Sequence, residues 1–242
     1  MRRLRAWVWL VVILGATVPF VTAGLIMRPF TDFYTRYRVI TQWTRFSLWL
    51  LERLCGIRYR IETEENLPQE AAIVMAKHQS AWETFAFQKM FPPQTWVLKR
   101  ELLRLPLFGW GLALLDPIAI DRSKGRKAGE QLLAQGAERL RRGIWLIIFP
   151  EGTRAAVGEH KRFKGGAARL AEHTGAPVVP VAHNAGLFWP RKSLPQRSGT
   201  ITVSIGPVIE SRGRNAEEIN AEAEAWIKKR TAELEAQGKE NA

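Results

Sequence analysis

The sequence contains a single cysteine, Cys55, among its 242 residues, so the fold cannot depend on an intramolecular disulfide. A chain of this length buries a core large enough to fold without disulfides or structural metals. A reducing compartment is therefore the default expectation. The four histidines and Cys55 show no spacing typical of metal ligands or of a cysteine nucleophile with its base. We predict no metal site, no cofactor and no covalent catalysis.

Acidic residues are scarce relative to basic ones. The chain has 36 lysines and arginines against 23 aspartates and glutamates, a formal net charge of +13. The excess is concentrated in residues 1–60, which hold ten arginines but only Asp32 and Glu52 as acids. Such an excess indicates a polyanionic partner, which could be nucleic acid, an anionic membrane surface or a phosphorylated substrate. The 46% hydrophobic composition excludes a disordered chain.

Charge is absent altogether from residues 7–27, and arginines flank this apolar segment on both sides. Its length is about that needed to cross the core of a bilayer. A secretory signal peptide is the alternative, but the segment is long for one and no small-residue cleavage site follows it. Pro19 within it also allows a kinked or re-entrant segment, so a membrane span and an embedded hairpin both stay open.

Residues 33–55 predict an amphipathic helix, because apolar residues recur at steps of three and four with arginines between them. Four of the ten tryptophans lie in these two segments, and indole rings favour the bilayer interface. We expect residues 1–60 to form a membrane anchor rather than part of a soluble core. The arginines after residue 27 slightly outnumber those before residue 7, which places the remaining chain on the cytoplasmic side.

Residues 61–242 predict an α/β domain, because short apolar runs typical of buried strands alternate with helical patterns. This order favours a mixed, largely parallel sheet flanked by helices. The strands are predicted over residues 73–76, 95–98, 117–120, 144–149, 177–181 and 200–205, and the helices over 81–90, 124–142 and 166–173. Asn215 with Glu218 resembles a capping box that opens a final helix.

His78 directly follows the predicted strand 73–76 and precedes a helix, the position at which α/β folds carry reactive groups. Glu83 lies five residues later, close enough to accept a hydrogen bond from the imidazole. A carboxylate there fixes the tautomer and leaves the other ring nitrogen free to take a proton from an alcohol. By spacing alone, a purely structural His–Glu pair is the alternative.

A second polar cluster, Phe149-Pro150-Glu151-Gly152-Thr153-Arg154, follows the apolar strand 144–148. Proline and glycine force a turn at the strand end, and Thr153 and Arg154 follow as candidate anion ligands. A guanidinium offers planar, bidentate donors that suit a phosphate. Taken alone, the turn is equally compatible with a surface salt bridge.

Together the two clusters resemble the glycerolipid acyltransferase family, and within it the bacterial 1-acylglycerol-3-phosphate acyltransferases. The family's H-x4-D motif is similar to His78 with Glu83, and its F-P-E-G-T/S-R motif is matched by residues 149–154. Further ordered matches are Lys99-Arg100-Glu101-Leu102, Pro106-Leu107-Phe108-Gly109, Ile120-Asp121-Arg122, Phe163-Lys164-Gly165-Gly166 and Val178-Val179-Pro180-Val181. The resemblance covers about residues 61–208. Glu83, one methylene longer than the family's aspartate, is the departure.

This resemblance implies transfer of a fatty acyl group from a thioester of acyl carrier protein or coenzyme A to the sn-2 hydroxyl of 1-acylglycerol-3-phosphate, which gives phosphatidic acid. It implies His78 as the general base and Glu83 as its orienting partner. Substrate binding would fall to Lys99, Arg122, Glu151, Gly152, Thr153 and Arg154. Backbone N–H groups of residues 78–80 or 152–153 are candidates for stabilising the oxyanion. The expected location is the inner, cytoplasmic membrane with its anionic phospholipids, the active site facing the cytoplasm.

Two other functions stay open. An acyltransferase for another lysolipid, such as lyso-ornithine lipid, would use the same chemistry with a different acceptor pocket. A non-catalytic, membrane-anchored protein that binds anionic lipids would use the charge and the tryptophans, but it gives no reason for His78 and Glu83 at a strand end. Nucleic acid is not expected as a partner, because the arginines adjoin membrane-like segments and no nucleic-acid-binding motif is present.

Overall fold

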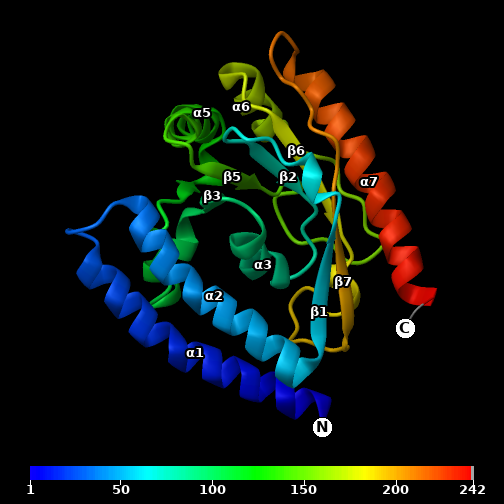
Figure 1. Cartoon of the computed structure of the whole chain (residues 1–242). Coiled ribbons are helices and arrows are strands. Elements are labelled where there is room, and N and C mark those ends of the chain that lie inside the picture. The colour runs from blue at the N-terminus through cyan, green and yellow to red at the C-terminus, as the bar shows by residue number, and fades with distance from the viewer. Residues whose placement is uncertain (241–242) are drawn as a thin grey trace.

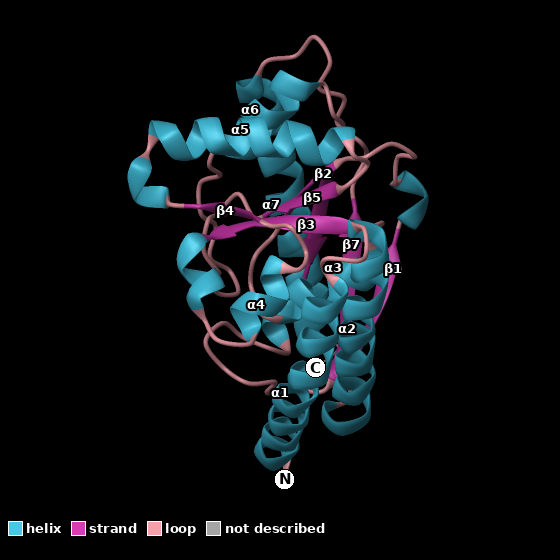
Figure 2. Cartoon of the chain, turned by 90° about the vertical axis from the view of Figure 1, so that its left-hand side faces the viewer, coloured by secondary structure: helices cyan, strands magenta, loops and turns pink. Residues whose placement is uncertain are grey.

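Seven strands form one sheet with helices on both faces (Figures 1 and 2). The computed structural model describes residues 1–240, without the side chains of Arg122 and Glu240. The helices are α1 (Arg2–Met27), α2 (Phe33–Cys55), α3 (Trp82–Met90), α4 (Phe108–Ala113), α5 (Arg126–Arg141), α6 (Gly166–Thr174) and α7 (Ala216–Glu240). The strands are β1 (Ile57–Glu62), β2 (Ile73–Ala76), β3 (Gln94–Lys99), β4 (Ile118–Ile120), β5 (Trp145–Ile148), β6 (Val178–His183) and β7 (Gly199–Ile205).

The strand order is β1-β7-β6-β2-β5-β3-β4. All neighbours pair in parallel except β6 with β7, so the predicted mixed, largely parallel sheet is confirmed. The edge strand β1 was not expected. Its apolar residues alternate with Arg58 and Arg60, the pattern of a half-buried strand, but it follows a basic helix without a break in composition. The boundary expected after residue 60 falls within β1.

The side chains of the central strands alternate between two cores, as the two-residue period of a strand requires. From β2, Val74 and Ala76 pack with residues of α2 and α3, whereas Ile73 and Met75 pack with residues of α5, α6 and α7. Figure 2 shows α5 and α6 on one side of the sheet and α2 and α3 on the other. Since both faces are covered, the strands are continuously apolar.

Helix α2 is capped at both ends. The carboxylate of Asp32 accepts a hydrogen bond from the N–H of Thr35 at 2.8 Å, which caps the first turn. Gly56 follows the last turn in the left-handed conformation, with φ of 66°, which glycine adopts without strain. The predicted amphipathic helix is therefore present with defined ends.

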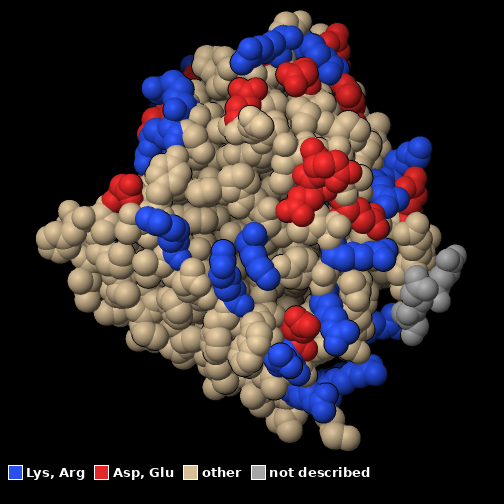
Figure 3. All heavy atoms as spheres, viewed as in Figure 1, with Lys and Arg blue, Asp and Glu red and all other residues tan. Residues whose placement is uncertain are grey.

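Helix α1 lies lengthwise along α2 and is attached to the domain by Trp9 (Figure 1). The indole N–H of Trp9 donates to the carbonyl of Ser47 at 3.0 Å, and its ring makes edge contacts with Trp189 and Phe85. The opposite face of α1 exposes Leu4, Trp7, Val8, Val11, Val12, Leu14, Val18, Leu25 and Ile26. By length and composition α1 could cross a membrane. Basic side chains gather around the beginning of this helix (Figure 3).

We expect Trp9→Ala to lower the free energy of unfolding by about 3–5 kcal/mol, because it empties a buried aromatic site. Trp7, which is 56% exposed, is the matched control. Trp7→Ala removes the same atoms without opening a cavity and should change stability by less than about 0.5 kcal/mol. Denaturant unfolding of the full chain in detergent measures both values. Equal losses would contradict the docking of α1 through Trp9.

Candidate active site

The parallel pairing of β2 with β5 brings the two polar clusters together. Met75 is in register with Ile148, so both strands end at the same edge of the sheet, and His78 and the 149–154 turn follow directly. The N–H of Ala155 donates to the carbonyl of His78 at 2.8 Å. The His78 ring stacks on Phe149, with centroids 4.0 Å apart and planes at 15°.

His78 and Glu83 form the expected pair, with 2.9 Å between Nδ1 and Oε1. The buried Glu83 carboxylate also accepts the N–H groups of Gln79 and Ser80, at 2.9 and 2.8 Å. It lies in the first turn of α3, where the helix dipole favours a negative charge. An ionised carboxylate is only an acceptor, so Nδ1 carries the proton and Nε2 is the free base nitrogen.

The surroundings keep this carboxylate ionised. Burial pushes the pKa of Glu83 upward, but the hydrogen bonds from His78 and Ser80 hold it below its usual value. Burial lowers the pKa of the nearby His183. Its Nε2 donates to the carbonyl of Lys77 at 2.9 Å and its Nδ1 accepts the N–H of Ala185, as in a neutral ring of one tautomer.

Glu151 is a second buried carboxylate, and it lies behind His78. Its two oxygens are 3.1 and 3.2 Å from Nζ of the buried Lys77, and Oε1 also accepts the N–H of His78 at 3.2 Å. Burial raises the pKa of Glu151, an effect that Lys77 partly offsets. Glu151 does not line the cavity described below, contrary to the expectation of a substrate-binding residue.

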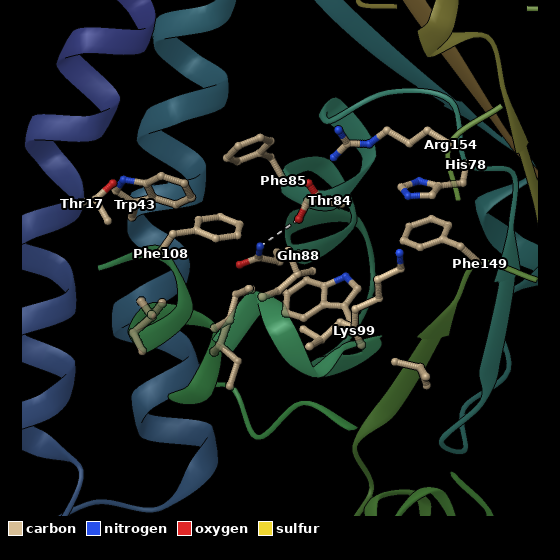
Figure 4. A pocket seen from close by; sticks show the side chains of 18 of the residues that line it. Thr17, Trp43, His78, Thr84, Phe85, Gln88, Lys99, Phe108, Phe149 and Arg154 are labelled. Carbon is tan, nitrogen blue, oxygen red and sulfur yellow. Dashed lines mark hydrogen bonds between the residues drawn. The ribbon is translucent and has the colours of Figure 1, made fainter. Parts of the chain in front are cut away.

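A cavity of about 470 Å³ opens beside His78 (Figure 4). Its polar end is lined by His78, Lys99, Gly152, Thr153, Arg154, Arg191 and Lys192. The remainder is mostly apolar and is lined from α1, α2, α3, β3 and α4 by residues that include Val21, Ile40, Trp43, Phe85, Trp96, Leu98, Phe108 and Leu115. A ligand that fills it must join an anionic group to an apolar chain.

In Figure 4 the ammonium group of Lys99 points toward the stacked pair of His78 and Phe149, whereas the side chain of Arg154 passes beside His78 and extends into the cavity. The buried Nε of Arg154 has no hydrogen-bond acceptor among the described residues. Arg191 donates to the carbonyl of Arg154 at 3.2 Å and lines the same end of the cavity. A buried donor without an acceptor costs stability, which an anionic ligand would recover.

Most of the candidate oxyanion donors are already engaged. The N–H groups of His78, Gln79 and Ser80 donate to Glu151 and Glu83, and that of Gly152 donates to the carbonyl of Phe149 at 3.0 Å. Gly152 has a φ of 72°, which explains glycine at this turn. The structure therefore corrects the expectation for these four groups. Thr153 lines the cavity, and within residues 1–240 its N–H has no acceptor.

Arg122, another of the expected substrate-binding residues, has its side chain outside the described part of the structure. Three cations at the site were missed: Lys77, Arg191 and Lys192. Only their tertiary placement distinguishes them from the many other basic residues. In the part of the chain that the structure describes, no three His, Cys, Asp or Glu side chains cluster as metal ligands would.

We expect Lys77→Met to destabilise the protein by about 3–5 kcal/mol, because it leaves a buried carboxylate without its cation. Lys77→Met/Glu151→Leu should recover most of that loss, since it removes both charges. Lys127→Met, at an exposed position on α5, is the control for the loss of a lysine and should be nearly neutral. Denaturant unfolding measures the three variants. A neutral Lys77→Met would show that the ion pair does not stabilise the site.

Comparison with known proteins agrees with this arrangement. Residues 58–184 match the family model described as Acyltransferase. The chain is 46% identical over 217 residues to the 1-acyl-sn-glycerol-3-phosphate acyltransferase of Pseudomonas aeruginosa, covering 88% of this chain and 84% of that protein. It is 31% identical over 178 residues to the enzyme of the same name from Saccharomyces cerevisiae, covering 70% and 58%.

The fold is also similar to a crystal structure. The 1-acyl-sn-glycerophosphate (LPA) acyltransferase from Thermotoga maritima superposes with a TM-score of 0.79 at 22% identity, over 98% of each chain. The similarity includes the N-terminal helix pair, because it covers nearly the whole chain. Since the family model spans both polar clusters and the identity to the Pseudomonas aeruginosa protein extends over most of both chains, this chain belongs to the acyltransferase family.

Proposed function

We propose that this acyltransferase moves a fatty acyl group from a thioester to the sn-2 hydroxyl of 1-acylglycerol-3-phosphate, giving phosphatidic acid, with His78 as general base. The observation that carries the proposal is the cavity beside His78, which joins a cationic end to an apolar wall. This combination suits an acceptor with both a phosphate and an acyl chain. Relatives from Pseudomonas aeruginosa and Saccharomyces cerevisiae are named for the same reaction.

The chemistry follows from the His78–Glu83 pair. An alcohol is a poor nucleophile at neutral pH, so Nε2 of His78 takes its proton as the oxygen attacks the thioester carbon. Glu83 stabilises the imidazolium that forms. Collapse of the tetrahedral intermediate breaks the carbon–sulfur bond, and the proton passes from His78 to the leaving thiolate. The N–H of Thr153 is the remaining backbone candidate for the oxyanion.

The cations at the polar end hold phosphate. Arg154 and Lys99 bind the phosphate of the acceptor and so bring its hydroxyl near His78. Gly152 and Thr153 line the same end of the cavity. Arg191 and Lys192 take the phosphates of the donor, which is acyl-coenzyme A or the phosphopantetheine arm of acyl carrier protein. Arg122 also binds substrate, as its I-D-R motif implies.

Glu151 and Lys77 act through His78 as positioning residues. Glu151 holds the N–H of His78, and Lys77 holds Glu151 while donating to the carbonyl of Glu159 at 3.0 Å. This places the backbone of His78 against the 149–154 turn. A rigid base is needed because a small misplacement lowers the rate of transfer.

We infer that residues 1–60 anchor the enzyme to the cytoplasmic face of the inner membrane, with residues 61–242 as the acyltransferase domain. The apolar face of α1 and the exposed residues Leu102, Leu105, Leu107, Phe108 and Trp110 supply the surface that enters the lipid. Trp9 attaches α1 along the domain, which favours embedding in one leaflet over a span. Some of these residues also line the cavity, so a lipid acceptor enters from the bilayer.

The test is acyl transfer by purified full-length protein from oleoyl thioesters of coenzyme A and acyl carrier protein. Lysophosphatidic acid, lyso-ornithine lipid and lysophosphatidylcholine serve as parallel acceptors. We expect phosphatidic acid, and His78→Ala should lower kcat by about 10²–10⁴-fold because the general base is lost. His173→Ala, at an exposed histidine on α6, should retain activity.

Other outcomes would revise the proposal. Transfer to lyso-ornithine lipid alone would keep the chemistry and replace the substrate. Full activity of His78→Ala, with unchanged unfolding, would remove His78 as the base. No transfer from either donor to any acceptor would favour a non-catalytic protein that binds anionic lipids.

Arg154→Ala should raise the KM for the lysophospholipid acceptor by roughly 10- to 100-fold, with a smaller effect on kcat, as expected when charge-assisted hydrogen bonds to a bound phosphate are lost. Arg141→Ala, at an exposed arginine of α5, controls for the change in net charge and should leave KM unaltered. Steady-state kinetics with each substrate varied in turn measures the effect. A rise confined to the KM of the thioester would assign Arg154 to the donor.

A further inference from the structure

A second basic concavity lies where α1 begins, α2 ends and residues 195–198 lead into β7. It has a volume of about 150 Å³. Four arginines line it: Arg2 and Arg5 of α1, Arg53 of α2, and Arg197. None of its lining residues lines the cavity beside His78. It belongs to the basic end of the molecule seen around the N-terminus (Figures 1 and 3).

The four arginines lack an acidic partner within the part of the chain that the structure describes. Among the described side chains, no carboxylate lies within the 4.0 Å of an ion pair from any of their guanidinium groups. Glu52, adjacent to Arg53 in sequence, pairs instead with Arg58 at 3.4 Å. The four arginines are exposed and line one hollow, and their like charges are not compensated by an acidic side chain among the described residues. A bound anion would compensate these charges and receive several charge-assisted hydrogen bonds.

An apolar hollow adjoins the basic one. It measures about 440 Å³ and is lined by Arg2, Arg3, Ala6, Trp7, Leu194, Pro195 and Gln196. Arg2, Pro195 and Gln196 line both hollows, so the two lie side by side and form a double hollow. Arginines line both parts, and the Trp7 ring with aliphatic side chains lines only the second. This arrangement matches an amphiphile better than a free ion.

We propose that the double hollow binds one anionic phospholipid, separate from the substrate. Its phosphate lies among Arg2, Arg5, Arg53 and Arg197, whose planar donors suit phosphate oxygens. Its acyl end lies along Trp7 and Leu194. The apolar exposed face of α1 starts at Leu4 beside this site, which places the arginines at the depth of the lipid headgroups.

The shape of the site separates a lipid from an acidic protein partner. A surface for acyl carrier protein would need cations spread over a convex or flat face, and it would not need the apolar hollow at Trp7. The bound lipid holds the beginning of α1 and the end of α2 against the membrane. The helix pair is thereby fixed at both its apolar face and its basic end.

The test is partition of the full-length protein into vesicles of phosphatidylcholine, with and without phosphatidylglycerol. Phosphatidylglycerol should increase the partition of the unmodified protein. We expect this increase to be about 25-fold smaller for Arg53→Gln/Arg197→Gln, since each arginine near an anionic surface strengthens membrane binding roughly fivefold. Partition into phosphatidylcholine alone should not change, because the apolar face of α1 is intact, and this shows that the variant is folded.

Arg141→Gln/Arg169→Gln is the matched control, because it removes the same charge from exposed positions on α5 and α6. This control should keep the increase in partition that phosphatidylglycerol causes. An equal loss of that increase in both variants would overturn the proposal and show that net charge alone drives binding. If inorganic phosphate, added at constant ionic strength, abolished the increase in partition caused by phosphatidylglycerol, the site would be assigned to free phosphate. An unchanged increase in the Arg53/Arg197 variant, with impaired transfer from acyl carrier protein, would assign it to the carrier. The readout is binding, so it is independent of acyl transfer.

Discussion

The parallel pairing of β2 with β5 is the constraint on which the site depends. It ends both strands at one edge of the sheet, so His78 and Glu151 meet although they lie 73 residues apart in the chain. The hydrogen bond between Ala155 and His78 closes the two loops on each other. Helix α3 then carries Glu83 back to the imidazole. A shift of register between these strands would separate His78 from the 149–154 turn.

Two buried carboxylates hold His78 in place, and the negative charge of each is stabilised in a different way. Glu83 is stabilised by backbone N–H groups, a helix N-terminus and the imidazole, and it keeps a low pKa. Glu151 depends on one cation, Lys77, and burial keeps its pKa high. One orients the ring and the other holds the backbone, so His78 is fixed from two directions.

The N-terminal helix pair contributes to structure and site alike. Trp9 and Ile13 are buried against the domain, other residues of α1 and α2 form the apolar wall of the cavity, and the opposite face of α1 is exposed. Helix α1 therefore lines the cavity with one face and exposes an apolar surface with the other. The arginines at the beginning of α1 and the end of α2 lie at the far end of the same pair, away from the His78 cavity.

The sequence by itself determined the elements and the chemistry they carry. Periods of two and of three to four residues predicted the strands and helices, and the order of His78, Glu83 and the 149–154 turn indicated the family. The sequence did not reveal β1. Its arginines alternate with apolar residues, a pattern that identifies an edge strand only once β7 is known to pair with it. Glu83 is one methylene longer than the family's aspartate, and only the tertiary structure shows that its carboxylate reaches Nδ1 of His78.

Only the tertiary structure decided where long-range charges meet. It directed Glu151 toward Lys77 instead of the cavity, brought Arg191 and Lys192 beside Arg154, and gathered four arginines around one hollow. The physical reason is that periodicity records which face of an element is buried. The partner of a charge is set instead by sheet register and helix docking, which join residues far apart in the chain.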